Sequence, residues 1–180
     1  MSTQWFYPAT VSQVAEHDYH IPWKNSQGAS PVIFDQYNTT SLTTVKPLLH
    51  ISNATAGDIR TKTWYLHLTN FGFTDLPNTI QGIEVQINVK RGRVLEDTVR
   101  LFHNGDMIGD NLVYYVQDTE EHIKIIPNPV YGGPTNLWGL DSINPSLLDS
   151  TFGLCLRFQS HPYYPHNEAP LLQNVAMRIY

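Results

Sequence analysis

The eight histidines are the residues best suited to chemistry, because an imidazole binds metals and transfers protons near neutral pH. The two closest groups in the sequence are His17 with His20, and His161 with His166. A metal site needs three or four ligands that converge from rigid elements, and neither pair has a third ligand beside it. There is no His-Glu-x-x-His motif and no pair of cysteines. We therefore interpret these histidines as exposed or interface residues and predict no metal site.

Oxygen ligands and nucleophiles give an equally weak signal. The stretches Asn104–Asp106 and Gly109–Asn111 could supply oxygens to calcium, but the calcium-loop pattern with its closing glutamate is absent. Cys155 falls on the outward phase of an alternating segment, and no Gly-x-Ser-x-Gly elbow is present. Two carboxylates for glycoside hydrolysis could come from any two strands, yet no pair stands out. The sequence predicts no catalytic residue, no cofactor and a protein that is not an enzyme.

Length and composition limit the protein class. The 180 residues fit one compact domain, and 41% hydrophobic with 12% aromatic residues is too much for a disordered chain. Charged residues make up only 15%, against roughly 25% in soluble domains, which predicts a polar, weakly charged surface suited to permanent contacts. The net charge of −5 disfavours nucleic-acid binding. The single cysteine cannot form an intrachain disulfide, as expected for assembly in a reducing cytosol.

Targeting signals are also missing from the sequence. The first residues lack the basic start and apolar run of a secretory signal, and no stretch approaches 18 uninterrupted apolar residues. We therefore expect a chain that is made in the cytoplasm and has no membrane contact.

Alternation of apolar and polar residues predicts several short strands. The clearest segment is 83–90, and the same period of two recurs in 64–69, 154–159 and 175–180. Each of these strands should have one exposed face. The pair Asn104-Gly105 predicts a tight hairpin, and Pro145 predicts a short helical turn at 144–148.

This pattern favours an all-β fold, an antiparallel β-sandwich of jelly-roll type, over residues 26–180. Residues 1–25 contain apolar clusters without sustained alternation and are predicted to form an extended N-terminal arm. The arm contains Trp5, Phe6 and Tyr7, and an exposed aromatic patch this large is rare on a monomer. We therefore expect the arm to pack on its own sandwich or on a neighbouring subunit.

Aromatic side chains outside the alternating strands are the candidate interface residues. Planar, amphipathic rings in loops can anchor a protein interface, fill gaps beside the core or stack on sugars. We favour the protein interface among these three alternatives. The candidates are Trp5, Phe6, Tyr7, Trp23, Tyr163 and Tyr164.

Four stretches of the sequence resemble a known module, and together they span about residues 60–180. They are Leu66–Phe73, Leu76–Val85, the Tyr-Gly-Gly block Tyr131–Gly139 and Phe152–Leu154. In these stretches the chain is similar to a β-sandwich module of tailed-bacteriophage virion structural proteins. The opening Tyr7–Thr10 is similar to the arm that precedes this module. Its glycines at strand ends would permit close backbone approach, and Trp138 would be a core plug at a sharp turn.

The resemblance implies a virion component that acts by assembly rather than chemistry. We expect an accessory subunit of the tail, baseplate or collar, or a capsid decoration protein. It would form a homo-oligomer, for example a trimer, and contact other virion structural proteins. The loop Gln159–Pro170 departs from the module and is where partner-specific contacts are expected. The alternative is a carbohydrate-binding receptor module for a host glycan, with Tyr163, Tyr164 and Trp138 as contacts.

Overall fold

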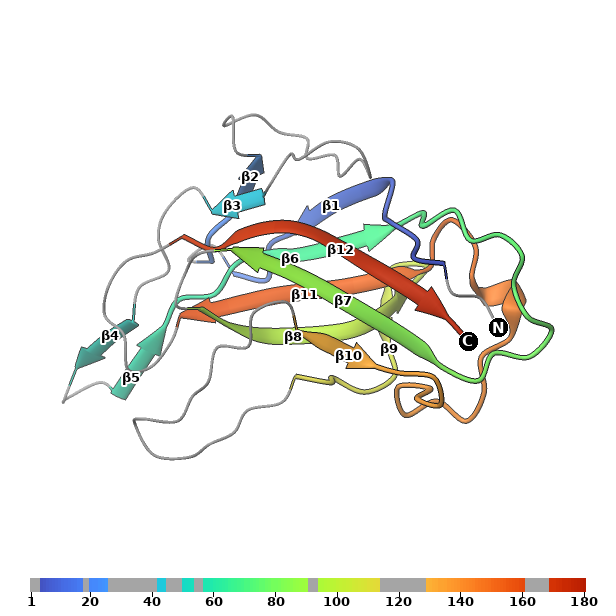
Figure 1. Ribbon diagram of the computed structural model, residues 1–180. Helices are drawn as coiled ribbons and strands as arrows, with labels where there is room; N and C mark the ends of the chain where they lie inside the picture. Colours follow the sequence, from blue (N-terminus) through green and yellow to red (C-terminus); the bar gives the residue numbers. More distant parts are fainter. Residues whose placement is uncertain are drawn as a thin grey trace.

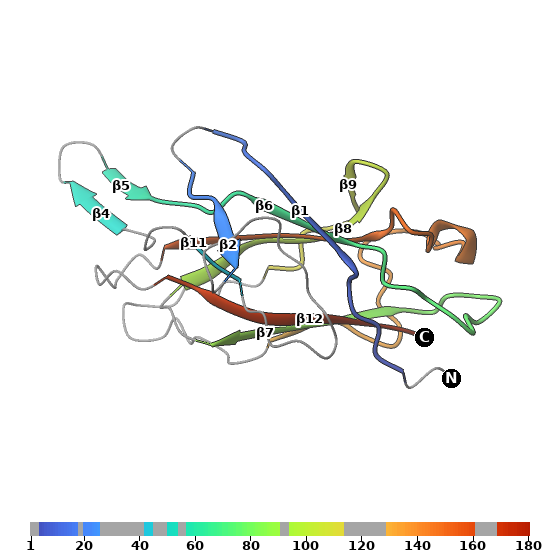
Figure 2. The ribbon, with the colours of Figure 1, turned by 90° about the horizontal axis from the view of Figure 1, so that it is seen from above.

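The computed structural model describes residues 4–17, 20–25, 42–44, 50–53, 57–90, 94–113, 129–160 and 169–180. In this part of the chain, strands form two five-stranded antiparallel sheets that pack face to face, together with one separate pair of strands. The two sheets form the layers of a sandwich, seen from the front in Figure 1 and from above in Figure 2. The predicted all-β sandwich is confirmed. The described residues include no apolar helix of membrane-spanning length.

The sheet that lies at the back in Figure 1 has the order β1-β6-β11-β8-β9. We call it the back sheet. Its strands are β1 (Thr10–Val14), β6 (Tyr65–Thr69), β11 (Gly153–Ser160), β8 (Val94–His103) and β9 (Asp106–Ile108).

The front sheet has the order β10-β7-β12-β3-β2. Its strands are β10 (Val130–Gly132), β7 (Ile83–Lys90), β12 (Leu171–Ile179), β3 (Leu42–Thr44) and β2 (Trp23–Asn25). The separate pair is β4 (His50–Asn53) with β5 (Gly57–Arg60).

The core forms between the inner faces of the two sheets. Ile83, Val85 and Ile87 of β7 are fully buried, as the alternation of that strand predicts. They face Leu66 and Leu68 of β6, which are equally buried in the back sheet. One apolar row from each sheet thus supplies the burial that holds the layers together.

The predicted turns are confirmed. Asn104 and Gly105 both have positive φ, 49° and 97°, and they connect β8 to β9 with His103 opposite Asp106. Two such residues are what a tight hairpin turn requires. The single turn of 3₁₀ helix η1 (Pro145–Leu147) begins with proline, and the side chain of Asn144 caps it.

The described residues of the predicted arm lie on their own sandwich. Phe6 exchanges two backbone hydrogen bonds with Met177 of β12, at 2.8 and 2.9 Å. The chain then crosses to the back sheet, where the amide of Ala9 donates to Asn70 and β1 pairs with β6 without a bulge. The N-terminal segment therefore joins one edge of each sheet.

The expectation of one exposed face per strand is wrong for β11. Every residue of this strand is buried, including Cys155 and Arg157 on its outer face. β11 lies at the centre of the back sheet, so side chains from both neighbouring strands lie over it. His67, opposite Cys155 on β6, and Phe102, opposite Gly153 on β8, stack with ring centroids 4.1 Å apart. Period-two alternation identifies the strand but not the cover on its second face.

Candidate functional site

Three connecting segments meet at one end of the sandwich, at the right in Figure 1. The segment 70–82 joins β6 to β7, 103–113 contains β9 and the residues on either side of it, and 132–152 joins β10 to β11. The pairing fixes this convergence, because Gly153 lies opposite both Thr69 and Phe102, and Gly132 lies opposite Glu84. We call this surface the acidic end.

The three segments of the acidic end contain five aspartates and no lysine or arginine. One basic group reaches them from a strand: the guanidinium of Arg100 on β8 donates to the carbonyl of Gly109. Asp75, Asp106, Asp110, Asp141 and Asp149 are all exposed. The chain has 16 acidic and 11 basic residues, so removing these five leaves 11 of each sign. The formal net charge of −5 therefore resides entirely in the three segments.

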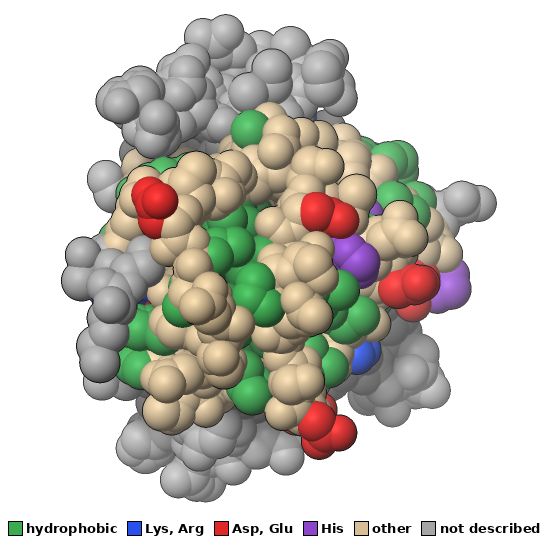
Figure 3. All heavy atoms as spheres, turned by 90° about the vertical axis from the view of Figure 1, so that its right-hand side faces the viewer, with side chains coloured by type: hydrophobic (Ala, Val, Ile, Leu, Met, Phe, Trp, Pro, Cys, Tyr) green, Lys and Arg blue, Asp and Glu red, His purple; other side chains and the backbone are tan. Residues whose placement is uncertain are grey.

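Hydrophobic side chains with some exposed surface lie between the carboxylates. Figure 3 shows this end face-on, with acidic groups spaced around hydrophobic atoms. The partly buried side chains here are Phe73, Leu76, Leu137, Leu140 and Leu147, each packed against the main core. A polar, charged rim around apolar groups is the usual composition of a protein interface.

Trp138 makes the acidic end rigid. Its side chain is completely buried, and its backbone has φ of 58°, a left-handed conformation that is rare for a bulky residue. The indole nitrogen donates to the carbonyl of Ile83 at 2.9 Å, and the carbonyl of Trp138 accepts from Asp110 at 2.6 Å. Its amide donates to the side chain of Asn136 at 2.7 Å. These bonds from three sides hold a conformation that would otherwise cost about 1–3 kcal/mol.

Close backbone contacts complete the scaffold. A Cβ at Gly153 would overlap the carbonyl oxygen of Leu68, and one at Gly82 would overlap the backbone of Gly133 and Pro134. The predicted roles of these glycines and of Trp138 as a core plug are confirmed. Because Trp138 is buried, it has no surface with which to stack on a sugar, so its assignment to a glycan site is wrong.

His103 and Asp149 form a histidine–carboxylate pair at this end, a combination that can transfer protons. Their side chains are 3.5 Å apart, and Asp149 also accepts hydrogen bonds from the amide and hydroxyl of Thr151, each at 2.7 Å. These bonds from Thr151, with the neighbouring His103, lower the pKa of Asp149. The carboxylate of Asp149 is thus used to close a turn.

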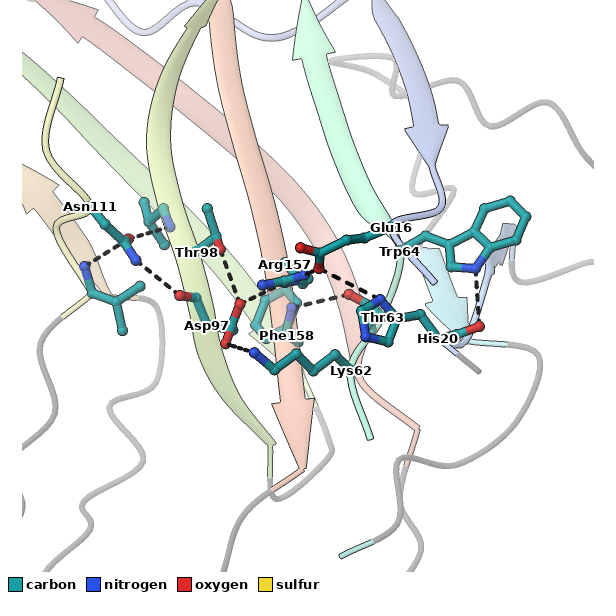
Figure 4. A network of polar contacts seen from close by, with 12 residues as sticks. Glu16, His20, Lys62, Thr63, Trp64, Asp97, Thr98, Asn111, Arg157 and Phe158 are labelled. Atoms are coloured by element: carbon teal, nitrogen blue, oxygen red, sulfur yellow. Dashed lines mark hydrogen bonds and ion pairs between the residues drawn. The ribbon is translucent and has the colours of Figure 1, made fainter. Parts of the chain in front are cut away.

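A second charged group lies on the outer face of the back sheet, and we call it the Arg157 cluster (Figure 4). The guanidinium of Arg157 is 2.6 Å from Asp97 and forms a second ion pair with Glu16 of the N-terminal segment. Lys62 pairs with the same Asp97 at 2.8 Å. Arg157 also lies over the ring of Tyr65, 4.1 Å from its centroid. This cluster ties the N-terminal segment to the sheet.

The pKa shifts follow this pairing. Burial acts to raise the pKa of Asp97, but the hydrogen bond from Lys62 and the charge of Arg157 outweigh it and lower the pKa. For Glu16 burial also acts to raise the pKa, and Arg157 reverses the sign. Burial lowers the pKa of His20, and the nearby charge of Arg157 adds to this effect. The acids of the cluster are therefore ionised at neutral pH.

Cys155 is unreactive, as predicted from its place in a strand. Its thiol is completely buried, and burial raises the pKa to about 12. A thiol with this pKa has almost no thiolate at neutral pH and is a poor nucleophile.

The structure divides the predicted interface residues into three groups. Phe6 and Trp23 are 4% and 2% exposed within their own chain, so in this arrangement neither ring has surface left for a neighbour. Trp23 packs edge-on against Phe158 and donates to the carbonyl of Trp64 at 3.0 Å. Both side chains pack in the core because the N-terminal segment closes the open side between the sheets.

Trp5 and Tyr7 are half-buried and keep some exposed surface. The guanidinium of Arg178 lies 4.5 Å from the Trp5 ring centroid and forms an ion pair with Glu84 at 2.6 Å. Tyr163 and Tyr164 lie outside the described residues, as does most of the loop Gln159–Pro170. An interface role for these four aromatic residues stays a prediction.

Of the two predicted histidine groups, the structure describes one. His17 and His20 lie together, with ring centroids 5.2 Å apart, but the described residues contain no group of three or more potential ligands around them. His161 and His166 lie outside the described residues. The Asn104–Asp106 stretch forms the hairpin turn described above.

Sequence reasoning did not identify the acidic end. Its signal is present, since three segments contain five aspartates and no basic residue. It could be found only by knowing that these segments meet at one end, which depends on strand order. The chain matches no protein-family model, no curated protein and no solved structure.

Proposed function

We propose that this chain is a non-enzymatic structural subunit of a tailed-bacteriophage particle. In this role it is an accessory subunit of the tail, baseplate or collar, or a capsid decoration protein. It docks by its acidic end onto a basic, partly apolar surface of another virion protein. The observation that carries the proposal is that the five aspartates that account for the formal net charge lie together on one rigid end of the sandwich, beside partly buried apolar side chains.

The charge distribution supports a binding role for this end. Asp149 pairs with His103 and closes a turn with Thr151, but no ion pair is seen in the described residues for Asp75, Asp106, Asp110 and Asp141. These four exposed carboxylates repel one another and contribute little to folding. On approach to a basic partner the same carboxylates attract and orient it, and they exclude acidic surfaces. The apolar side chains between them supply the area whose burial stabilises the contact.

The scaffold supports the same role. Trp138 and the tightly packed glycines fix the loops of the acidic end before any partner arrives. A preformed surface loses little conformational freedom on binding, so more of its contact energy appears as affinity. The stretches that resemble the virion module, Tyr131–Gly139 and Phe152–Leu154, are the ones that build this scaffold.

The experiment is incorporation into particles. A triple variant, Asp75→Asn, Asp106→Asn and Asp141→Asn, removes three exposed charges without changing side-chain size. The matched control is Thr79→Ala, Ser142→Ala and Ser150→Ala, which alters exposed polar groups at the same end. Both variants are expressed during phage growth in place of the original chain, and purified virions are quantified by mass spectrometry.

We expect the control to be incorporated normally and the aspartate variant to be reduced about tenfold or more, as expected for the loss of a few interfacial charges. Equal incorporation of both variants would show that docking does not use the acidic end. Absence of the original chain from purified virions would overturn the assignment to the particle itself.

A further inference from the structure

The outer edge of β1 in the back sheet has the features of a self-pairing strand. β1 is the first strand in the order of that sheet, and among the described residues no strand pairs with its other side. It lies near the top of the sandwich in Figure 1, and in the view from above it runs obliquely across the sheets (Figure 2). A free strand edge carries unpaired amide and carbonyl groups, whose natural complement is another strand.

The pairing pattern shows which backbone groups point outward. The amide of Ala9 donates to Asn70 of the segment that follows β6, and the register continues without a bulge through Val14 opposite Tyr65. In an antiparallel pair, hydrogen-bonded residues alternate with residues whose groups point away. Val11 and Gln13 therefore bond to β6, whereas Thr10, Ser12 and Val14 direct their amides and carbonyls to the free edge.

The side chains of this edge lack the features that normally block pairing. Thr10, Ser12 and Val14 are exposed, and the strand has no charged residue and no proline. The other edges of the two large sheets differ. β2 carries Lys24, β9 carries Asp106, and β10 ends at a positive-φ glycine. Each of them has three residues, against five in β1.

We propose that two copies of this chain pair through antiparallel β1 strands about a two-fold axis at Ser12. Ser12 then faces Ser12 of the second copy, and Thr10 faces its Val14. Each of these residue pairs exchanges both backbone hydrogen bonds, because all three residues direct their groups outward. The back sheets of the two copies become one continuous sheet, and β1 is no longer an edge.

The register also explains the exposure of Val14. Its side chain is 48% exposed, and Val130 is the other large hydrophobic residue of the described chain with this much exposed surface. In the paired arrangement Val14 lies across from a threonine, and β-branched cross-strand pairs are favourable. A two-fold interface uses the same surface on both copies, so one uncharged strand suffices.

This inference rests on the proposed function, a subunit that acts by assembly, and names a second copy as one partner. The acidic end lies at the end of the sandwich and β1 along its side, so both surfaces can be occupied together (Figure 1). Self-pairing is tested on the isolated chain and docking on whole virions, which separates failure of one from failure of the other.

The first experiment is sedimentation velocity of the full chain from about 1 to 500 μM, a range that covers weak strand pairing. We expect a reversible dimer. Ser12→Lys places two like charges directly opposite each other at the two-fold axis and should raise the dimer dissociation constant about tenfold or more. The matched control is Val130→Lys on β10, where the side chain is 53% exposed, and it should leave the dimer unchanged.

The second experiment identifies the strand involved. Amide hydrogen exchange at Thr10, Ser12 and Val14 should slow as protein concentration rises, because these amides are bonded only in the dimer. Ser12→Pro removes one outward donor while keeping the bonds to β6, and it should weaken the dimer with little change in melting temperature. A monomer at every concentration, or a dimer in which these three amides exchange at the monomer rate, would overturn the proposal.

Discussion

The central charges of the Arg157 cluster are buried and paired, whereas most of those at the acidic end are exposed and unpaired. In the Arg157 cluster the side chains of Arg157 and Asp97 are only 7% and 12% exposed, and each charge has an opposite partner within hydrogen-bond distance. At the acidic end five carboxylates are exposed, and their three segments contain no lysine or arginine.

This difference shows which charges the fold needs. A buried ion cannot be left alone, because desolvation costs several kcal/mol unless a partner offsets it. An exposed carboxylate is solvated by water and contributes little to stability. The Arg157 cluster therefore belongs to the folding of the chain and its N-terminal segment, whereas the charges of the acidic end are available to a partner.

The rigid core beneath the acidic end should show the largest effect on stability. Trp138→Ala removes a completely buried indole and one of the two donors to the carbonyl of Ile83, which keeps only the amide of Gly133. We expect a loss of about 3–5 kcal/mol in the free energy of unfolding, measured by urea denaturation. Leu140→Ala, at a half-buried position of the same segment, is the control and should cost less. A loss under about 1 kcal/mol for Trp138→Ala would show that this end is not rigidly packed.

Disruption of the Arg157 cluster should have the next largest effect. Arg157→Ala removes the buried cation beside Asp97, which keeps Lys62 and the hydroxyl of Thr98, so we expect a loss of about 3 kcal/mol. Glu16→Gln alters the more exposed partner, whose side chain is 42% exposed, and should cost less than about 1 kcal/mol. Equal effects of the two substitutions in urea denaturation would contradict the distinction between buried and exposed charge.

The outer face of the back sheet should also respond to acid. Burial lowers the pKa of His67 from its usual value of 6.5, so the folded state binds fewer protons than the unfolded state. The contribution of His67 is complete above pH 6.5 and is lost as the pH falls through the lower pKa of the folded state. Between pH 7.5 and 5 the original chain should therefore lose more stability than His67→Gln.

Denaturant titrations of both chains at several pH values measure the difference in their free energies of unfolding. The other titrating groups are the same in both chains, so their contributions cancel in this difference. A stability difference between the two chains that does not change with pH would mean that His67 titrates normally. A change of the opposite sign would place it beside a carboxylate.

Local sequence patterns predicted the elements, and long-range packing decided what those patterns left open. The strand 83–90 has the predicted bounds, because its alternation is uninterrupted and one face is buried. The Asn104-Gly105 hairpin follows from two residues that accept positive φ. Both features depend only on neighbouring residues.

The buried outer face of β11 depends instead on residues far away in the sequence. Arg157 meets Asp97 and Glu16, which lie 60 and 141 positions from it. A bulge between Arg157 and Phe158 leaves Asp97 unpaired in the ladder with β8 and brings it beside the guanidinium. Neither the bulge nor the path of the N-terminal segment has a local signature, so the cluster could not be predicted from alternation. The acidic end was missed for the same reason.

The smallest effect on stability should come from the exposed aspartates themselves. Asp75→Asn with Asp141→Asn should change the free energy of unfolding by less than about 0.5 kcal/mol, since neither position is buried. At low salt the variant should be equal or slightly more stable, because it reduces repulsion among like charges, and the difference should shrink at high salt as screening increases.

Asp149→Asn is the contrast at the same end, because its carboxylate accepts two hydrogen bonds from Thr151 and its replacement should be more destabilising. Urea denaturation at about 10 and 500 mM salt, chosen so that the Debye length changes severalfold, compares the three chains. A loss above about 1 kcal/mol for the double variant would make these carboxylates part of the fold and remove the reason for assigning them to a partner.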